Sequence, residues 1–186
     1  QPCFYNELIK LIRRVTNMSA YTFNDKEGSI SIHKTDLPSP WINYLSNGRM
    51  HAFVSQAGGG FAWWKNPAFY HMTRYRAYNL PIDSPGFYIY IRHEDGSVWS
   101  PSFRPAEMAL DSFTATHEPG TTVFRAAKGD YSASLRLFIA PDHDVLVWDL
   151  ELCNNSGKDE EVDIFAYVEL SQLNWLNEVT FGYYWK

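Results

Sequence analysis

Residues 121–139 read TTVFRAAKGDYSASLRLFI and predict a β-hairpin. The residues Lys128-Gly129-Asp130 are typical of a tight turn and divide the stretch into two arms. The second arm alternates small or apolar residues with polar ones: Ala133, Leu135 and Leu137 against Ser132, Ser134 and Arg136. Because successive side chains of a strand point to opposite faces, we expect the first set to face a core and the second set to face water.

Short apolar segments of this kind recur along the chain, each bounded by turn residues. They are residues 29–33, 41–45, 50–56, 61–64, 87–91, 97–99, 121–126, 131–139, 145–152 and 162–170. An Asp-Gly pair at 95–96 is typical of a hairpin turn. The glycine run at 58–60 is expected to be a bend between strands, because it lacks the spacing and the lysine of a phosphate-binding loop. Recurrent short strands with turn-rich connections predict an all-β fold, an antiparallel β-sandwich.

The first residues differ from the rest of the chain. Residues 7–15 have a short helical rhythm, and the first methionine is Met18. We expect an N-terminal extension at residues 1–17, either helical or foreign to the native chain. A β-sandwich domain of residues 18–186 would follow. The aromatic residues near Lys186 would form an exposed apolar edge if the sheet ended there, so the domain is expected to be cut short at its C-terminal end.

Composition excludes several classes of protein. A net charge of −5 argues against a nucleic-acid binder, which normally carries a basic surplus. Cys3 and Cys153 are too few for a disulfide framework, so both are expected to be free thiols. No apolar run approaches the roughly 20 residues that span a bilayer, and the start lacks the pattern of a signal peptide. We therefore expect a cytoplasmic protein with no membrane partner.

No residue set in the sequence identifies a catalytic centre. No serine lies in a Gly-x-Ser-x-Gly pattern, and spacing alone selects no pair of carboxylates for glycoside chemistry. The triplet Asp142-His143-Asp144 has no further histidine or cysteine beside it and is expected to be a hairpin turn, not a metal site. The sequence itself therefore predicts no catalytic residue and no metal.

Residues 63–79 concentrate aromatic rings and cations. The rings are Trp63, Trp64, Phe69, Tyr70, Tyr75 and Tyr78. They suit either a platform for stacking sugars or an aromatic core, and core is the more frequent use of such rings in a sandwich. Arg74 and Arg76 occupy alternate positions and so share one strand face. A bound anion and a structural carboxylate are equally suitable partners for them.

Six motifs occur in one order along the chain. They are Ser39-Pro40-Trp41-Ile42-Asn43-Tyr44-Leu45; Ala57-Gly58-Gly59; Thr73-Arg74-Tyr75-Arg76 with Asn79; Trp99-Ser100-Pro101-Ser102-Phe103 with Pro105; Leu110-Asp111-Ser112; and Tyr167-Val168-Glu169. Together they resemble the N-terminal region of the family 94 inverting glycoside phosphorylases, which include cellobiose, cellodextrin, laminaribiose and chitobiose phosphorylases. The resemblance runs from Met18 to the last residue.

The resemblance implies a β-sandwich that precedes a helical linker, an α/α barrel and a small C-terminal β-domain. In the family, phosphate attacks the anomeric carbon of a β-glycoside with inversion and releases α-glucose 1-phosphate. The general acid and the phosphate-binding residues belong to the barrel, so none is expected here. Inorganic phosphate is the co-substrate of the full-length enzyme, and no metal or organic cofactor is implied. The implied partners are a β-linked glucose disaccharide or oligosaccharide, the chain's own barrel, and a second copy in a homodimer.

The resemblance also suggests roles for individual residues. Cellobiose phosphorylases carry an Asn-Tyr-Gln-Arg-Asn pattern that shapes the acceptor side of the active site, and residues 181–185 correspond to it here. We expect Tyr183, Tyr184 and Trp185 to bind substrate, and their difference from the family pattern favours an acceptor other than that of cellobiose. Scaffold or interface roles are expected for Arg74, Arg76, Trp41 and Asn43. The alternative is a free-standing carbohydrate-binding β-sandwich.

Overall fold

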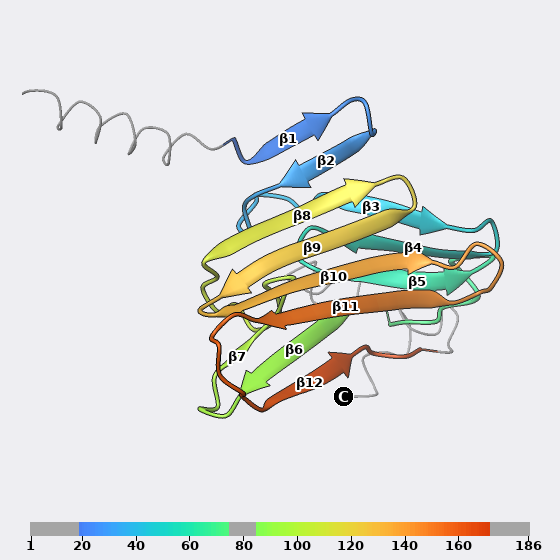
Figure 1. The fold of residues 1–186 in the computed structure, drawn as a ribbon. Helices are drawn as coiled ribbons and strands as arrows, with labels where there is room; N and C mark the ends of the chain where they lie inside the picture. The colour runs from blue at the N-terminus through green and yellow to red at the C-terminus, as the bar shows by residue number, and fades with distance from the viewer. Residues whose placement is uncertain (1–18, 75–84, 172–186) are drawn as a thin grey trace, which may run out of the picture.

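The computed structural model describes residues 19–74 and 85–171 (Figure 1). All regular secondary structure in these ranges is β-strand. The predicted all-β fold is therefore confirmed. The strands are β1 Tyr21–Asn24, β2 Ser29–Ile32, β3 Ile42–Ser46, β4 Met50–Ser55, β5 Gly60–Trp64, β6 Tyr88–His93, β7 Val98–Trp99, β8 Ser112–Glu118, β9 Thr121–Lys128, β10 Tyr131–Ile139, β11 Leu146–Asn154 and β12 Val162–Tyr167.

One layer of the fold is a six-stranded antiparallel sheet in the order β1-β2-β8-β9-β10-β11. The hairpin predicted at residues 121–139 forms its centre, with Leu135 opposite Phe124. The predicted alternation is confirmed, because Leu135 and Leu137 are fully buried while Arg136 is exposed. Strands β8 to β11 follow one another as a meander in which each strand pairs with the next.

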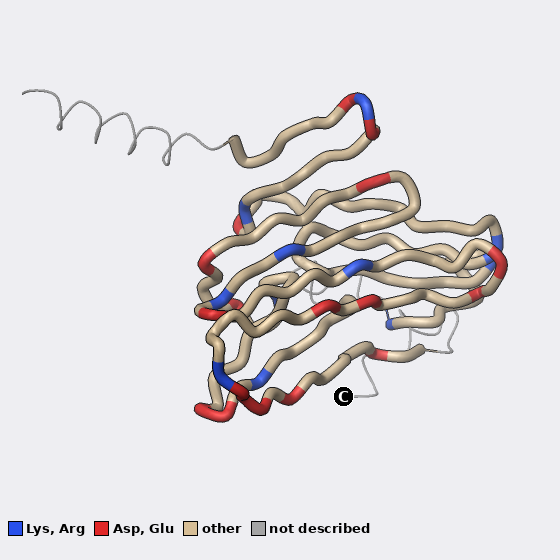
Figure 2. Tube along the Cα trace, viewed as in Figure 1, with Lys and Arg blue, Asp and Glu red and all other residues tan. Residues whose placement is uncertain are grey.

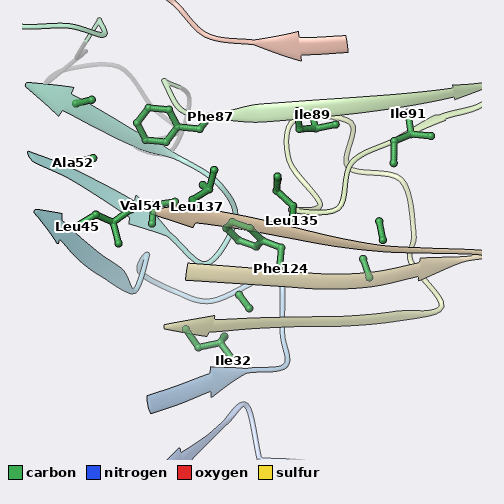
Figure 3. Close-up of a cluster of buried hydrophobic side chains, with 14 of the residues drawn as sticks. Ile32, Leu45, Ala52, Val54, Phe87, Ile89, Ile91, Phe124, Leu135 and Leu137 are labelled. Carbon is green, nitrogen blue, oxygen red and sulfur yellow. The ribbon is translucent and has the colours of Figure 1, made fainter. Parts of the chain in front are cut away.

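The other layer consists of two three-stranded sheets, in the orders β3-β4-β5 and β12-β6-β7. An isolated bridge between Gly59 and Gly86 joins them where β5 and β6 begin. The apolar side chains of both layers meet in one core, which Figure 3 shows between the strands. Ile32, Leu45, Val54, Phe87, Phe124 and Leu135 are among its most deeply buried members.

The glycine run bends the chain between β4 and β5, as predicted. Gly58 has φ of +82°, a conformation that side chains with a Cβ rarely adopt. At Gly60 a Cβ would collide with the carbonyl oxygen of Phe53, and at Gly86 it would collide with the carbonyl oxygen of Gly58. The two small sheets are therefore joined at a point where main chains touch and no side chain fits.

Two strands were not predicted. All four residues of β1 are exposed. The strand therefore has no buried face, and its sequence lacks the apolar pattern on which the prediction depended. In β8, only Phe113 and Ala115 are apolar, and the buried residues Ala115, Thr116 and His117 are consecutive, so burial does not follow a period of two. The prediction that a strand reaches residue 170 was wrong at its end, because β12 stops at Tyr167.

The structure also bears on the expected turn at residues 141–144, on metal and membrane features, and on the two cysteines. Residues 141–144 bend the chain between β10 and β11, which confirms the predicted turn at Asp142-His143-Asp144. In the described ranges no three His, Cys, Asp or Glu residues are grouped to hold a metal, and no helix is long and apolar enough to cross a membrane. Cys153 is a free, exposed thiol, whereas Cys3 and the extension at residues 1–17 lie outside the described residues.

Candidate functional site

Two of the sequence motifs meet at one point, although about ninety residues separate them in the chain. An isolated bridge pairs Thr73 with Leu170. The amide of Arg74 donates a 2.8 Å hydrogen bond to the carbonyl of Glu169, and the amide of Ser171 donates a 3.1 Å hydrogen bond to the carbonyl of Met72. The motif that contains Thr73 and Arg74 is thus fixed to the motif that ends at Glu169. We call this place the Arg74–Glu169 junction.

Side chains reinforce the junction. The Arg74 Nη1 lies 3.6 Å from the Glu169 Oε2, and the side chains of both residues are partly exposed. The Tyr167 hydroxyl donates a 2.9 Å hydrogen bond to the other carboxylate oxygen of Glu169. Of the two partners considered for Arg74, the structure therefore contains the carboxylate.

Two further motifs approach the junction through Tyr88. Its ring stacks on the ring of Tyr167 with the centroids 6.5 Å apart. Tyr88 also borders Gly58, where an added Cβ would lie 2.9 Å from the Cβ of Ser102. The glycine motif and the Ser-Pro-Ser-Phe motif therefore pack together beside this ring. Four of the six motifs thus converge on one end of β6 and β12.

The Ser-Pro-Ser-Phe motif lies at the beginning of an irregular turn. The hydroxyl of Ser102 donates a 2.9 Å hydrogen bond to the carbonyl of Arg104. Phe103 has φ of +70°, and the peptide bond between Arg104 and Pro105 is cis. The hydroxyl of Ser100 is buried and has no hydrogen-bond partner in the part of the chain that the structure describes.

Several predicted site residues belong to the segments that follow the junction in sequence. Arg74 and Ser171 are the last described residues before the segments 75–84 and 172–186. Arg76 belongs to the first of these segments, and Tyr183, Tyr184 and Trp185 belong to the second. These four residues lie outside the described residues, so their roles stay predictions.

Asn43 connects the two layers of the sandwich. Its Nδ2 donates hydrogen bonds of 2.8 Å to the carbonyls of Glu118 and Thr121 and contacts the hydroxyl of Thr122 at 3.1 Å. One amide on β3 thereby satisfies acceptors at the β8–β9 hairpin of the opposite sheet. This geometry is compatible with the scaffold role expected for Asn43.

Trp41 belongs to the same network. Its amide donates a 2.7 Å hydrogen bond to the side chain of Gln56, and its carbonyl lies 3.1 Å from the Nε2 of His117. The other ring nitrogen of His117 lies 3.0 Å from the Thr122 hydroxyl. Burial lowers the pKa of His117, although the hydrogen bond to Trp41 acts in the opposite direction. Trp41 is therefore tied to the core through its main chain.

The tryptophans of residues 63–79 point to opposite faces of β5. Trp64 packs against the core, and its indole N–H donates a 2.9 Å hydrogen bond to Asp144. Trp63 lies on the outer face, where it stacks on Phe61 and on His51 with centroid distances of 5.2 and 5.5 Å. Among the described rings of residues 63–79, Phe69 and Tyr70 are exposed, whereas Trp63 and Trp64 are half-buried. Tyr75 and Tyr78 lie outside the described residues.

A second feature was missed by the sequence analysis: an open hollow of about 610 Å³ at the far end of β6 from Tyr88. Turns that are distant in sequence form its walls, with His93, Lys128, Tyr131 and Glu160 among the lining residues. The Tyr131 hydroxyl donates a 2.6 Å hydrogen bond to Glu160, and this bond is the main cause that raises the pKa of Tyr131 to about 12. Figure 2 shows acidic residues at the surrounding turns. Of the six motifs, only the one that begins at Trp99 contributes to the hollow, through Trp99 itself.

The chain is similar in sequence to known proteins. A family model described as glycosyl hydrolase 94, supersandwich domain, matches residues 26–179. The N,N'-diacetylchitobiose phosphorylase of Vibrio furnissii is 32% identical over 152 residues, which are 80% of this chain and 19% of that protein. The solabiose phosphorylase of Paenibacillus borealis is 32% identical over 139 residues, which are 74% of this chain and 18% of that protein.

A third relative, the 3-O-beta-D-glucopyranosyl-beta-D-glucuronide phosphorylase of Paenibacillus borealis, is 25% identical over 134 residues. The chain thus spans less than a fifth of the length of these relatives, at 19%, 18% and 16%. The family match covers almost all of the described strands and confirms the resemblance inferred from the six motifs. By its supersandwich domain, the chain belongs to glycosyl hydrolase family 94.

Proposed function

We propose that the chain is the non-catalytic N-terminal sandwich of an inverting β-glycoside phosphorylase. The observation that carries the proposal is the Arg74–Glu169 junction, where motifs of the family meet beside the start of residues 172–186. That segment contains Tyr183, Tyr184 and Trp185, to which we assign contact with the acceptor sugar. In this proposal the sandwich shapes the acceptor side of an active site whose catalytic groups belong to another domain.

The junction is suited to positioning and not to proton transfer. Glu169 accepts a hydrogen bond from Tyr167 and is paired with Arg74, so its carboxylate is engaged by two structural partners. A general acid must instead be within hydrogen-bond reach of the glycosidic oxygen and hold a proton at working pH. We therefore place the general acid outside this chain, in the barrel domain.

The proposed reaction needs inorganic phosphate and no metal or organic cofactor. A phosphate oxygen forms a bond to the anomeric carbon of a β-glucoside, and the bond from that carbon to the acceptor oxygen breaks. The acceptor oxygen takes a proton from the general acid, so the products are α-glucose 1-phosphate and a shortened sugar. The substrate class proposed is a β-linked glucose disaccharide or oligosaccharide. The relatives are named for different sugars, which supports a sugar substrate that varies within the family.

The first experiment compares this 186-residue chain with the full-length protein encoded by its gene. Each is incubated with phosphate and with cellobiose, laminaribiose or chitobiose, and the sugar 1-phosphate released is measured, which is α-glucose 1-phosphate for the first two sugars and the 1-phosphate of the amino sugar for chitobiose. We expect release by the full-length protein alone. Release by the isolated chain, or none by a folded full-length protein with any β-linked disaccharide, would count against the proposal.

The second experiment tests the acceptor assignment. Tyr183→Ala and Tyr184→Ala are expected to change the ratio of kcat/KM between acceptor sugars in the full-length enzyme while leaving its unfolding midpoint unchanged. Phe23→Ala is the matched control, since Phe23 is exposed on β1 and belongs to neither segment next to the junction. The acceptor role would be refuted if all three variants had the same ratio of kcat/KM between acceptor sugars as the unsubstituted enzyme.

The homodimer and the cytoplasmic location remain part of the proposal. Light scattering on the full-length protein is expected to give twice the monomer mass, and cell fractionation is expected to place the protein in the cytoplasm. A monomer that retains full activity would contradict the predicted homodimer. Recovery of the protein outside the cytoplasm would contradict the predicted location.

A free-standing carbohydrate-binding sandwich is the second candidate. Exposed rings favour it, since Tyr44, Phe69 and Tyr70 are 65%, 62% and 51% exposed. Aromatic side chains with accessible faces suit stacking on sugar rings. Calorimetric titration of the isolated chain with cellobiose, laminaribiose and chitobiose separates the candidates. Tight binding without other domains would favour the free-standing module.

A further inference from the structure

The hollow at the far end of β6 has a floor that is held in place by its own contacts. The indole N–H of Trp99 donates a 2.9 Å hydrogen bond to Nε2 of His93, and the His93 ring lies edge-on to the ring of Tyr131 with the centroids 4.5 Å apart. Trp99 and Tyr131 are buried, at 1% and 6% exposure. The floor is therefore formed before any ligand arrives, as is usual for small-molecule sites.

Three connections of the chain form most of the wall, and they lie together at one end of the sandwich (Figure 1). They are the turn between β6 and β7, the turn between β9 and β10, and the segment between β11 and β12. Met108 adds an apolar side chain that is 38% exposed. The volume of about 610 Å³ is within the range of about 300–1,000 Å³ that is typical of ligand pockets, so a small organic molecule has room there.

Hydrogen-bond donors without a partner line the hollow. Because an indole N–H only donates, Nε2 of His93 accepts, and the proton of the neutral ring is on Nδ1. This Nδ1 has no hydrogen-bond partner in the described ranges. The ammonium group of Lys128 likewise makes no hydrogen bond and no ion pair with any described residue. Two donors are therefore available to a ligand.

Acceptors with spare capacity line the same space. Glu160 uses one carboxylate oxygen for the Tyr131 hydroxyl, and Glu94 uses one for the amide of Glu161. The second oxygen of each carboxylate has no partner among the described residues, and the carboxylate of Asp130 has none among them at all. The hollow thus offers both donors and acceptors that the fold leaves unengaged.

This mixture favours a neutral saccharide over other ligands. Each sugar hydroxyl both donates and accepts, so adjacent hydroxyls can bridge a carboxylate and an ammonium group. An anion would be repelled by four carboxylates, those of Glu94, Asp95, Asp130 and Glu160. An organic cation would be repelled by Lys128, and no three His, Cys, Asp or Glu residues in the described ranges are grouped to hold a metal ion. A wholly apolar ligand would desolvate the carboxylates without replacing their hydrogen bonds.

We propose that the hollow binds a neutral saccharide, with the hydroxyls of one or two sugar rings between Lys128 and the carboxylates of Asp130 and Glu160. The inference goes beyond the proposed function, because it concerns binding by this chain alone and gives the hollow no part in phosphorolysis. Since the hollow is open to solvent, binding is expected in the millimolar range. That affinity is weaker than the tight binding that would identify a free-standing module.

Nuclear magnetic resonance on the isotope-labelled 186-residue chain tests the inference. At least one of cellobiose, laminaribiose and N,N'-diacetylchitobiose is expected to shift the amide resonances of Ser97, Gly129 and Asp130 until they saturate, and to leave those of β1 unchanged. Cellobiouronic acid, which has one carboxylate more than cellobiose, is expected to bind at least about tenfold more weakly than the neutral sugar, because like charges repel. Spermidine is the cationic probe and is expected to cause no saturable shift.

Three results of this titration would overturn the inference. The first is the absence of a saturable shift with all three neutral sugars. The second is a response to spermidine or cellobiouronic acid that equals or exceeds the response to the neutral sugars. The third is a set of shifts confined to the surroundings of Tyr44 and Tyr70, which would place the sugar on the exposed rings instead.

Substitution locates the bound sugar. Lys128→Met and Asp130→Asn each remove a charge that has no partner among the described residues, so both are expected to leave the unfolding midpoint unchanged. Each is expected to weaken saccharide binding at least about tenfold, the effect of losing a hydrogen bond to a charged group. Lys26→Met is the matched control, because Lys26 is exposed in the turn between β1 and β2. Unchanged affinity in both hollow variants, or an equal loss in the control, would contradict the inference.

Discussion

Arg74 and Glu169 are joined twice, by a 2.8 Å hydrogen bond between their main chains and by an ion pair of 3.6 Å between their side chains. Because the ion pair is partly exposed, Arg74→Ala is expected to lower the free energy of unfolding by only about 0.5–1 kcal/mol. Arg76→Ala is also expected to act on the stability of the domain or dimer more than on chemistry. Urea denaturation measures the loss, and a variant that folds normally but has no turnover would contradict the prediction.

Asn43→Ala is expected to have a larger effect on stability. The substitution removes a single amide that donates to two carbonyls and contacts one hydroxyl of the opposite layer. Leaving partly buried acceptors without a donor costs about 1–3 kcal/mol. Asn155→Ala is the control, because the side chain of Asn155 is exposed and makes one long hydrogen bond of 3.5 Å. Equal losses in the two variants would show that the cross-layer contacts are not important for stability.

His117 is expected to make stability depend on pH. The Trp41 carbonyl only accepts hydrogen bonds, so Nε2 carries the proton and Nδ1 accepts from Thr122 in a neutral ring. Burial lowers the pKa of His117 in the folded state below its ordinary value of about 6.5. The unfolded chain therefore binds more protons as the pH falls below about 6.5, and stability declines from there toward the folded pKa.

Denaturation curves between about pH 5 and pH 8 measure this decline. His117→Gln is expected to reduce the pH dependence, whereas His143→Gln, at an exposed position in the turn after β10, is expected to leave it unchanged. An undiminished acid-induced loss in His117→Gln would assign the effect to another group.

Gly60→Ala is expected to destabilise the fold by more than about 2 kcal/mol, because its Cβ would collide with the main chain of Phe53 and the ring of Phe87. Gly48→Ala is the control. Gly48 has φ of +87° but open space around its Cα, so that substitution costs only about 1 kcal/mol of backbone strain. Thermal unfolding compares the two, and an equal or smaller loss at Gly60 would show that β4 and β5 separate easily.

Local patterns were sufficient to predict most strands. The alternation of residues 131–139 fixed the faces of β10, and the Asp-Gly pair located the turn between β6 and β7. Strand β8 escaped prediction because its buried Thr116 and His117 are polar side chains. Hydrogen bonds to Ser31, Thr122 and Trp41 satisfy these side chains, and all three partners belong to other segments of the chain.

The candidate site was less predictable. The motif order indicated the family, but nothing in the sequence alone placed Arg74 beside Glu169, because pairing of distant segments depends on the whole fold. The hollow that contains Tyr131 and Glu160 was missed for the same reason, since its lining residues come from four separate segments of the chain. Short-range rules describe strands and turns, whereas a site assembled from remote loops requires coordinates.

The meander of β8 to β11 has a consequence for the route by which the chain folds. Its contacts are local in sequence, whereas the second layer pairs the remote strands β6 and β12 and also contains isolated bridges such as that between Thr73 and Leu170. Closing long loops slows folding. We therefore expect the meander to gain amide protection first in pulsed hydrogen exchange, with β6 and β12 protected later. The junction that carries the proposed function would then be among the last parts of the domain to form.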